Sequence, residues 1–249
     1  MVCRLPLTTP NAWRKLSPTT LKNLQKLSAS LTPFIAPVIA IDGPSASGKG
    51  TVAQLVADKL GFHYLDSGAL YRIVAFSAQK NNIEWNQADA LGKLASILEI
   101  QFKKGEIYLD GNCITEAVRS EEMSRGASVV AVHPKVRAAL LYLQRSFRQA
   151  PGLVADGRDM ASVVFTDAKL KIFLTASVEV RAERRYQQLK NKHLSANYEK
   201  ILADLQQRDL RDSARSASPL IQTKDALLLD TTQHSIEQAV AFVIAAYKK

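Results

Sequence analysis

Short apolar runs alternate with helical patterns from residue 37 onward. Residues 38–41 are all apolar, as expected of a strand that is buried on both faces of a sheet. Four more segments predict strands, a weaker one at 63–66 and three apolar ones at 153–155, 170–174 and 227–229. Strands separated by helices are typical of an α/β domain, so the pattern predicts a five-stranded parallel sheet with helices on both faces.

One stretch interrupts this alternation. Residues 98–104, 106–110 and 112–115 predict three short strands, with turns at Gly105 and at Asp110-Gly111. We therefore expect a small antiparallel insert within the α/β domain, at about residues 90–120.

Composition narrows the class of protein. The chain has 249 residues, of which 47% are hydrophobic and 22% charged, and this suits one large domain with a buried core. No apolar run approaches the roughly 18 residues of a transmembrane helix, so we expect no membrane partner. Cys3 and Cys113 are too few for a disulfide framework. A reducing, cytoplasmic setting is the expectation.

The formal charge of +10 is unevenly distributed along the chain. Five basic residues and no acidic residue precede Asp42, so half of the excess lies in residues 1–41. This segment is rich in Ser, Thr and Pro, and we assign residues 1–36 to an N-terminal extension and 37–249 to the domain. A disordered extension or an upstream start codon is the favoured interpretation, and a transit peptide is the alternative.

A glycine-rich loop follows the first strand and precedes an amphipathic helix. Gly43, Gly48 and Lys49 have the spacing of a phosphate-binding P-loop, in which backbone N–H groups and a lysine surround phosphates. Gly50 stands where Ser or Thr is usual, so Thr51 is the expected ligand of Mg²⁺. The residues predicted to bind ATP here are Gly43, Pro44, Ser45, Ala46, Ser47, Gly48, Lys49, Gly50 and Thr51.

The sequence lacks the motifs of two well-known classes of nucleotide-binding protein, the P-loop GTPases and the protein kinases. No Asn-Lys-x-Asp motif for guanine is present, because Asn191-Lys192 is followed by His193-Leu194. The His-Arg-Asp and Asp-Phe-Gly motifs of protein kinases are also missing.

Four polar clusters lie beyond the loop. Residues 66–72 and 155–160 each follow a predicted strand, at the sheet edge where open α/β sheets bind ligands. Two arginine clusters at helical spacing complete the set: Arg181, Arg184 and Arg185, and then Arg208, Arg211, Asp212 and Arg215.

Together these motifs resemble the bacterial cytidylate kinase family. They read IAIDGPSASGKGT, YLDSGALYR, VADGRDMASVVF, LKIFLTASVEVRAERRYQQL and RDLRDSARSASPL, and they extend from about Pro37 to the C-terminus. The resemblance implies a P-loop nucleoside monophosphate kinase fold with a monophosphate-binding insert and a helical lid at about 184–200. It also implies transfer of the ATP γ-phosphoryl group to CMP or dCMP with Mg²⁺, by a cytoplasmic monomer. Ala46, Ala161 and Thr166 depart from the usual family pattern. These departures affect the expected local backbone geometry but leave the charged residues of the motifs unchanged.

The resemblance also assigns residues to roles. Ser67, Arg72, Arg158 and Arg215 resemble the groups that hold the CMP phosphate. Arg208 and Asp212 resemble a pair that faces the pentose. Arg137 and Asp159 resemble the pair that reads cytosine, with Ser128 as a third contact or an ordinary helix serine. Tyr71 and Asp156 also belong to the substrate site, and Asp156 either orients Mg²⁺-bound water or forms a buried salt bridge. The catalytic residues implied are Lys49, Arg158, Arg184 and Arg185, and Arg181 is assigned to ATP.

Two alternatives remain open at this point. Another nucleoside monophosphate kinase, preferring AMP or UMP, would share the fold, although the pairing of Arg137 with Asp159 favours cytosine. A non-catalytic nucleic-acid-binding protein would use the net charge, but it gives no account of the glycine-rich loop. We therefore expect ATP and CMP or dCMP as partners, and no nucleic acid.

Overall fold

Five strands form one parallel sheet in the order β2-β6-β1-β7-β8. The computed structural model describes residues 35–103 and 105–249, so the predicted extension lies outside the described residues except for its last two. The strands are β1 (Val38–Asp42), β2 (His63–Asp66), β6 (Leu153–Gly157), β7 (Leu170–Thr175) and β8 (Leu227–Asp230). All five match predicted segments, and β1 and β6 are buried at every position.

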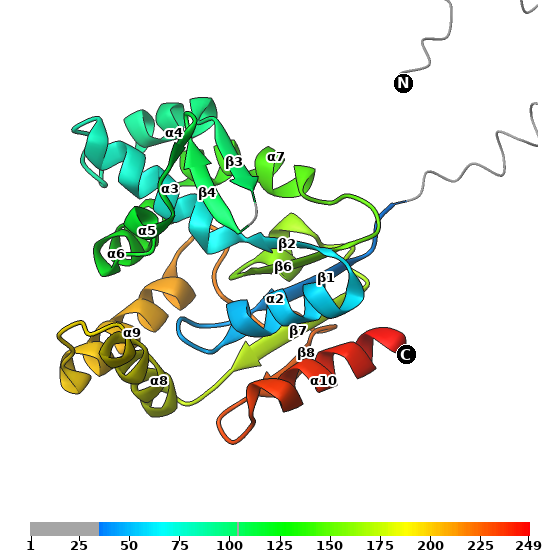
Figure 1. The fold of residues 1–249 in the computed structure, drawn as a ribbon. Helices are drawn as coiled ribbons and strands as arrows, with labels where there is room; N and C mark the ends of the chain where they lie inside the picture. Colours follow the sequence, from blue (N-terminus) through cyan, green and yellow to red (C-terminus); the bar gives the residue numbers. More distant parts are fainter. Residues whose placement is uncertain (1–34, 104) are drawn as a thin grey trace, which may run out of the picture. The chain divides into compact units, whose positions relative to one another are not determined.

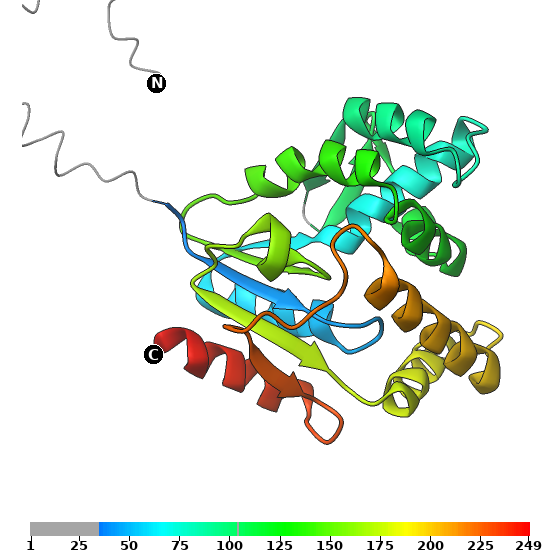
Figure 2. The ribbon, with the colours of Figure 1, turned by 180° about the vertical axis from the view of Figure 1, so that it is seen from behind.

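The side chains of β1 alternate between two apolar clusters, one on each face of the sheet. Ile39 and Ile41 pack with α2 (Lys49–Leu60) and α10 (Ile236–Lys248). Val38 and Ala40 belong to the cluster that includes α3 (Ser67–Lys80) and α7 (Pro134–Ser146). Figures 1 and 2 show the helices on the two faces. The predicted arrangement of a parallel sheet between helices is therefore confirmed.

The predicted antiparallel insert is present. Strands β3 (Ile100–Lys103), β4 (Glu106–Leu109) and β5 (Asn112–Cys113) form a separate three-stranded sheet in sequential order. The third strand is shorter than the predicted 112–115, because α5 (Thr115–Val118) begins there and the Thr115 hydroxyl accepts the Ile107 N–H at 2.8 Å. Helices α4 (Ala88–Ile97) and α6 (Glu121–Val130) flank this part of the chain.

Two further helices follow β7. They are α8 (Val178–Asn191) and α9 (Tyr198–Ala214), which pack against each other. The segment predicted as a lid, about 184–200, therefore spans the second half of α8, the connection and the start of α9. A short π-helical segment, η2 (Met160–Val164), follows β6. None of the helices in the described part of the chain has the length and apolar character needed to cross a membrane.

Candidate functional site

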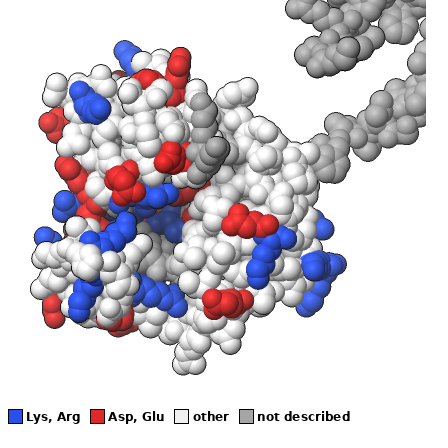
Figure 3. Space-filling model, in the orientation of Figure 1, with Lys and Arg blue, Asp and Glu red and all other residues white. Residues whose placement is uncertain are grey.

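A cleft of about 470 Å³ opens at the carboxyl ends of β1, β2 and β6. Its walls come from the glycine-rich loop, the start of α3, α6 and the helices α8 and α9. Nine cationic and six acidic side chains line it, so the cleft carries an excess of positive charge. Figure 3 shows Lys and Arg gathered around a hollow on this face of the molecule. Such a cleft favours an anionic ligand.

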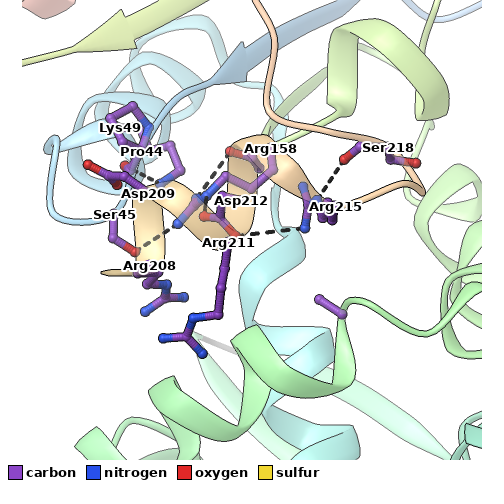
Figure 4. A network of polar contacts seen from close by, with 12 residues as sticks. Pro44, Ser45, Lys49, Arg158, Arg208, Asp209, Arg211, Asp212, Arg215 and Ser218 are labelled. Atoms are coloured by element: carbon purple, nitrogen blue, oxygen red, sulfur yellow. Dashed lines mark hydrogen bonds and ion pairs between the residues drawn. The ribbon is translucent and has the colours of Figure 1, made fainter. Parts of the chain in front are cut away.

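Two glycines shape the loop between β1 and α2. A Cβ on Gly43 would lie 1.9 Å from the backbone oxygen of Leu174 on β7, so no side chain fits there. Gly48 has φ of 90°, in the left-handed region, at the N-terminus of α2. Lys49 follows, and its ammonium donates to the Pro44 oxygen at 3.1 Å (Figure 4). Burial, and then the charge of Arg158, lower the pKa of Lys49 to about 7.

Asp156 at the end of β6 lies next to this loop. It accepts a 2.6 Å hydrogen bond from the Tyr64 hydroxyl on β2, a residue to which the sequence assigned no role. A Cβ on Gly50 would lie 3.5 Å from that hydroxyl and 3.9 Å from the Asp156 carboxylate. Burial, and then the charge of Asp66, raise the pKa of Asp156 to about 7. The Tyr64–Asp156 pair therefore lies where a side chain at position 50 would point.

These residues can contribute to a Mg²⁺ site but cannot form one alone. Within residues 35–103 and 105–249, no three His, Cys, Asp or Glu side chains group in a way that could hold a metal ion. Asp156 lines the cleft, whereas Thr51 is exposed on the first turn of α2 and does not line it. A single carboxylate beside a phosphate-binding loop fits Mg²⁺, which keeps several waters and takes phosphate oxygens as ligands.

Arg158 connects the loop to α9. Its Nε donates to Asp212 at 2.7 Å and its Nη2 donates to the Ser45 hydroxyl at 2.8 Å (Figure 4). Asp212 and Arg208, both expected on the pentose side, have different protein partners: Asp212 pairs with Arg158, and Arg208 donates to Ser124 on α6 at 2.9 Å. Burial opposes ionisation of Asp212, yet the charges of Arg158 and Arg208 bring its pKa below the usual value.

The residues predicted to read the base come together from α6, α7 and the end of β6. Arg137 on α7 forms an ion pair with Asp159, and its guanidinium lies 5.6 Å from the centre of the Tyr71 ring. Ser128 on α6 lines the same cleft, and its buried hydroxyl has no hydrogen-bond partner in the described residues.

Several other buried polar atoms of the predicted site also lack partners. In the described part of the chain eight buried side-chain polar atoms have none, and five of them belong to predicted residues. Since buried polar groups are nearly always hydrogen-bonded, such a concentration indicates a polar ligand. The five atoms are Ser47 Oγ, Arg72 Nε, Ser128 Oγ, Arg208 Nε and an Nη of Arg215.

The three arginines of α8 face different surroundings. Arg181, which is 4% exposed, donates to the Ala176 and Ser45 oxygens and to both carboxylate oxygens of Asp209. Arg184 donates to the Ser47 oxygen and to Thr231. Neither side chain lines the cleft.

Arg185 is the one of the three that lines the cleft. It forms an ion pair with Glu121, the first residue of α6. Sequence reasoning assigned no role to Glu121 or Asp209, because an acidic residue on a helix gives no sign of the arginine it will meet from another helix.

The remaining predicted residues also lie at this cleft. Ser67 and Arg72 belong to α3, which follows β2 directly, and Asp66 caps that helix by accepting the Ala69 N–H at 3.0 Å. Ser67 is buried close to Gly157, where an added Cβ would lie 2.6 Å from the serine hydroxyl. The motifs after β2 and β6 thus meet at one edge of the sheet, as expected of parallel neighbours.

Comparison with known proteins points to one family. The family model described as Cytidylate kinase matches residues 39–249. A protein named Cytidylate kinase from Polynucleobacter asymbioticus is 58% identical over 212 residues, which cover 85% of this chain and 96% of that protein. Relatives of the same name from Cupriavidus necator and Burkholderia thailandensis are each 56% identical. They cover 84% and 88% of this chain, and 95% and 97% of their own lengths.

Proposed function

The chain belongs to the cytidylate kinase family, and from this premise we propose that the cleft at the carboxyl ends of β1, β2 and β6 is its active site. The enzyme is a (d)CMP kinase: it phosphorylates CMP and dCMP at the expense of ATP. The observation that carries the site assignment is a set of unpartnered buried polar atoms on four residues that line this positively charged cleft, namely Arg72, Ser128, Arg208 and Arg215.

The acceptor phosphate is held by Ser67, Arg72, Arg158 and Arg215. Arg72 and Arg215 each keep a buried N–H group without a protein partner, which supports a phosphate oxygen as the missing acceptor. This phosphate is already anionic near neutral pH, so it needs little deprotonation. The reaction instead needs suppressed repulsion and in-line alignment of two polyanions, which arginines and Lys49 provide.

The cytosine ring is read by Asp159, Arg137 and Ser128. Cytosine presents an amine donor next to ring acceptors, so a carboxylate and a guanidinium complement its edge. Uracil would turn a carbonyl toward the carboxylate and leave buried groups unpaired. Arg208 and Asp212 take the pentose side, and Tyr71 supports Arg137 through its ring.

ATP binds along residues 43–51. Lys49 provides the point charge for the donor phosphates, and the α2 N-terminus adds positive potential. Arg185 faces the cleft and is the α8 arginine best placed to meet phosphates. Arg184 and Arg181 act on the ATP side through the loop oxygens of Ser47 and Ser45.

Mg²⁺ is part of this proposal. When bound, it supplies neutralisation of the phosphate charges. Asp156, directly or through water, is the residue of this chain that would hold it, whereas Thr51, the ligand expected from the sequence, does not line the cleft. We also propose that the enzyme is a cytoplasmic monomer without nucleic-acid partners. This rests on the family and on the fact that the excess of positive charge lines one small cleft.

A substrate panel tests the assignment. ADP formation is measured with CMP, dCMP, UMP and AMP for the wild type, Arg158→Ala and Asp159→Ala. We expect CMP and dCMP to be preferred, Arg158→Ala to lose activity by about 100-fold or more, and Asp159→Ala to lose base selectivity.

Two exposed positions serve as matched controls. Arg119→Ala and Asp89→Ala each remove a charge that pairs only at the surface, so both should behave as the wild type. Faster turnover of AMP than of CMP would refute the substrate assignment, and unchanged kinetics in both site variants would refute the residue roles.

A further inference from the structure

Asp42 is a buried carboxylate that the mechanism above does not use. It is the last residue of β1, directly before Gly43, and it is 2% exposed. Its two oxygens accept backbone N–H groups from different residues, Met160 at 2.8 Å and Ala161 at 2.8 Å. No Lys or Arg forms an ion pair with it in the described part of the chain. A charge is thus buried on the strand before the ATP loop and is balanced chiefly by two peptide groups.

Those two peptide groups directly follow Asp159. Asp159 has φ of −148° and ψ of 24°, which is neither helical nor extended, and Met160 and Ala161 then begin the η2 segment. The first N–H groups of a helical segment have no acceptor within it, so the chain there needs an outside acceptor to stay in place. Asp42 supplies that acceptor for both groups. The Asp42 side chain, at the end of β1, therefore fixes the direction in which the backbone continues after Asp159.

Asp159 itself has little freedom to compensate for a shift of this turn. It is buried, and it forms an ion pair with Arg137 on α7. A small displacement of the Met160–Ala161 backbone would move the Asp159 carboxylate relative to Arg137, and recognition of a base edge depends on hydrogen bonds with narrow geometric limits.

We propose that Asp42 is a positioning residue for base selection, which holds the turn after Asp159 so that the Asp159–Arg137 pair meets the cytosine edge. This inference rests on the proposed role of Asp159. Because Asp42 adjoins Gly43, the same side chain also links the ATP loop to the turn that reads the acceptor base.

A purely structural cap would behave differently from a positioning residue. Loss of a cap lowers stability and affects all acceptors alike. Loss of positioning changes the ratio of kcat/KM for CMP to kcat/KM for UMP, and the change comes mainly from KM for CMP. KM for ATP should move less, since Lys49 and the loop glycines remain.

The experiment compares Asp42→Asn, Asp42→Ala and Asp159→Asn with the wild type. Asparagine keeps the shape of the side chain but only one acceptor oxygen, whereas alanine keeps none. The ratio of kcat/KM for CMP to kcat/KM for UMP should therefore fall in Asp42→Asn and fall further in Asp42→Ala. We expect a fall of about tenfold for Asp42→Asn. Ser235→Ala is the matched control, because it removes the cap of α10, on another part of the fold, and should lower Tm without changing the ratio.

Each outcome decides a separate claim. If Asp159→Asn lowers the ratio and Asp42→Asn lowers only Tm, Asp42 is a cap and the inference is overturned. If Asp159→Asn leaves the ratio unchanged, the proposed role of Asp159 fails first. If Asp42→Ala does not fold, Asp42→Asn decides, and the shift of Tm by CMP against that by UMP gives a second readout of selectivity.

Discussion

Gly43 and the three arginines of α8 show which properties of single residues can be predicted from sequence and which depend on tertiary contacts. The spacing of Gly43, Gly48 and Lys49 identified a phosphate loop, but the need for glycine at position 43 comes from the Leu174 oxygen of β7. Arg181, Arg184 and Arg185 have equivalent local sequence surroundings. Tertiary packing distinguishes them: Arg185 lines the cleft, whereas Arg181 and Arg184 bond to backbone oxygens of the phosphate loop.

Asp42 gives a residue-scale prediction about pH. Burial raises the pKa of this carboxyl to about 6, the Ala161 and Met160 N–H groups lower it, and of the nearby charges Asp159 raises and Arg158 lowers it. A carboxyl with a higher pKa in the folded than in the unfolded protein binds its proton more tightly when folded. Its contribution to stability is therefore present at low pH and is lost as pH rises through about 6.

We expect the free energy of unfolding of the wild type, relative to Asp42→Asn, to decrease by on the order of 2 kcal/mol between about pH 4 and pH 7. Urea unfolding of both proteins across this range measures the difference. Gln206→Ala, at an exposed and uncharged residue of α9, should show no such dependence relative to the wild type. A constant difference between wild type and Asp42→Asn would contradict the raised pKa.

At the scale of elements, burial explains why the strands of the parallel sheet were predicted well, whereas the three strands of the insert are each shorter than predicted. β1 and β6 are apolar over most of their length because they lie in the middle of a covered sheet, and such runs are easy to recognise. The last strand of the insert was predicted over 112–115, because Thr115 suits a strand by composition. Its hydroxyl instead accepts the Ile107 N–H and α5 begins there.

The packing of α8 on α9 yields a prediction at the same scale. Asp209 on α9 accepts two hydrogen bonds from the buried Arg181 of α8, at 2.6 and 3.1 Å. Asp209→Ala leaves that guanidinium without its charged partner and should lower the free energy of unfolding by about 2 kcal/mol. KM for ATP should rise, because Arg181 also holds the Ser45 oxygen. Urea unfolding and steady-state kinetics measure the two effects.

Gln206→Ala is the control on the same helix, because Gln206 is exposed. It should change neither quantity. If Asp209→Ala unfolds at the same urea concentration as Gln206→Ala, the Arg181–Asp209 pair does not stabilise the packing of these two helices.

On the scale of the whole molecule, the charge of +10 has two parts. Half lies before Asp42, in a segment outside the described residues for most of its length, and a further excess lines the cleft. The residues proposed for the site all lie between Gly43 and Arg215, and the family model matches from residue 39. The proposed chemistry thus uses only the domain.

Removal of residues 1–34 tests this division. We expect kcat/KM for CMP to stay within about twofold of the full chain, with an unchanged Tm, because no site residue is removed. Side-by-side kinetics and thermal unfolding of the two chains measure this. A large loss of activity would mean that the N-terminal segment contributes to the domain.

The sequence by itself determined the strands, the phosphate loop, the insert and the family, because these depend on local apolar runs and on residues at fixed spacing. The motifs of the family also identified most of the cationic residues that line the cleft. Tertiary structure alone decided the partners: Arg158 with Asp212, Arg181 with Asp209, Tyr64 with Asp156, and Asp42 with the turn after Asp159. These contacts join residues 28 to 119 positions apart. Pairing over such separations is set by how the sheet orders its strands and how helices pack upon it, and neither is visible in local sequence.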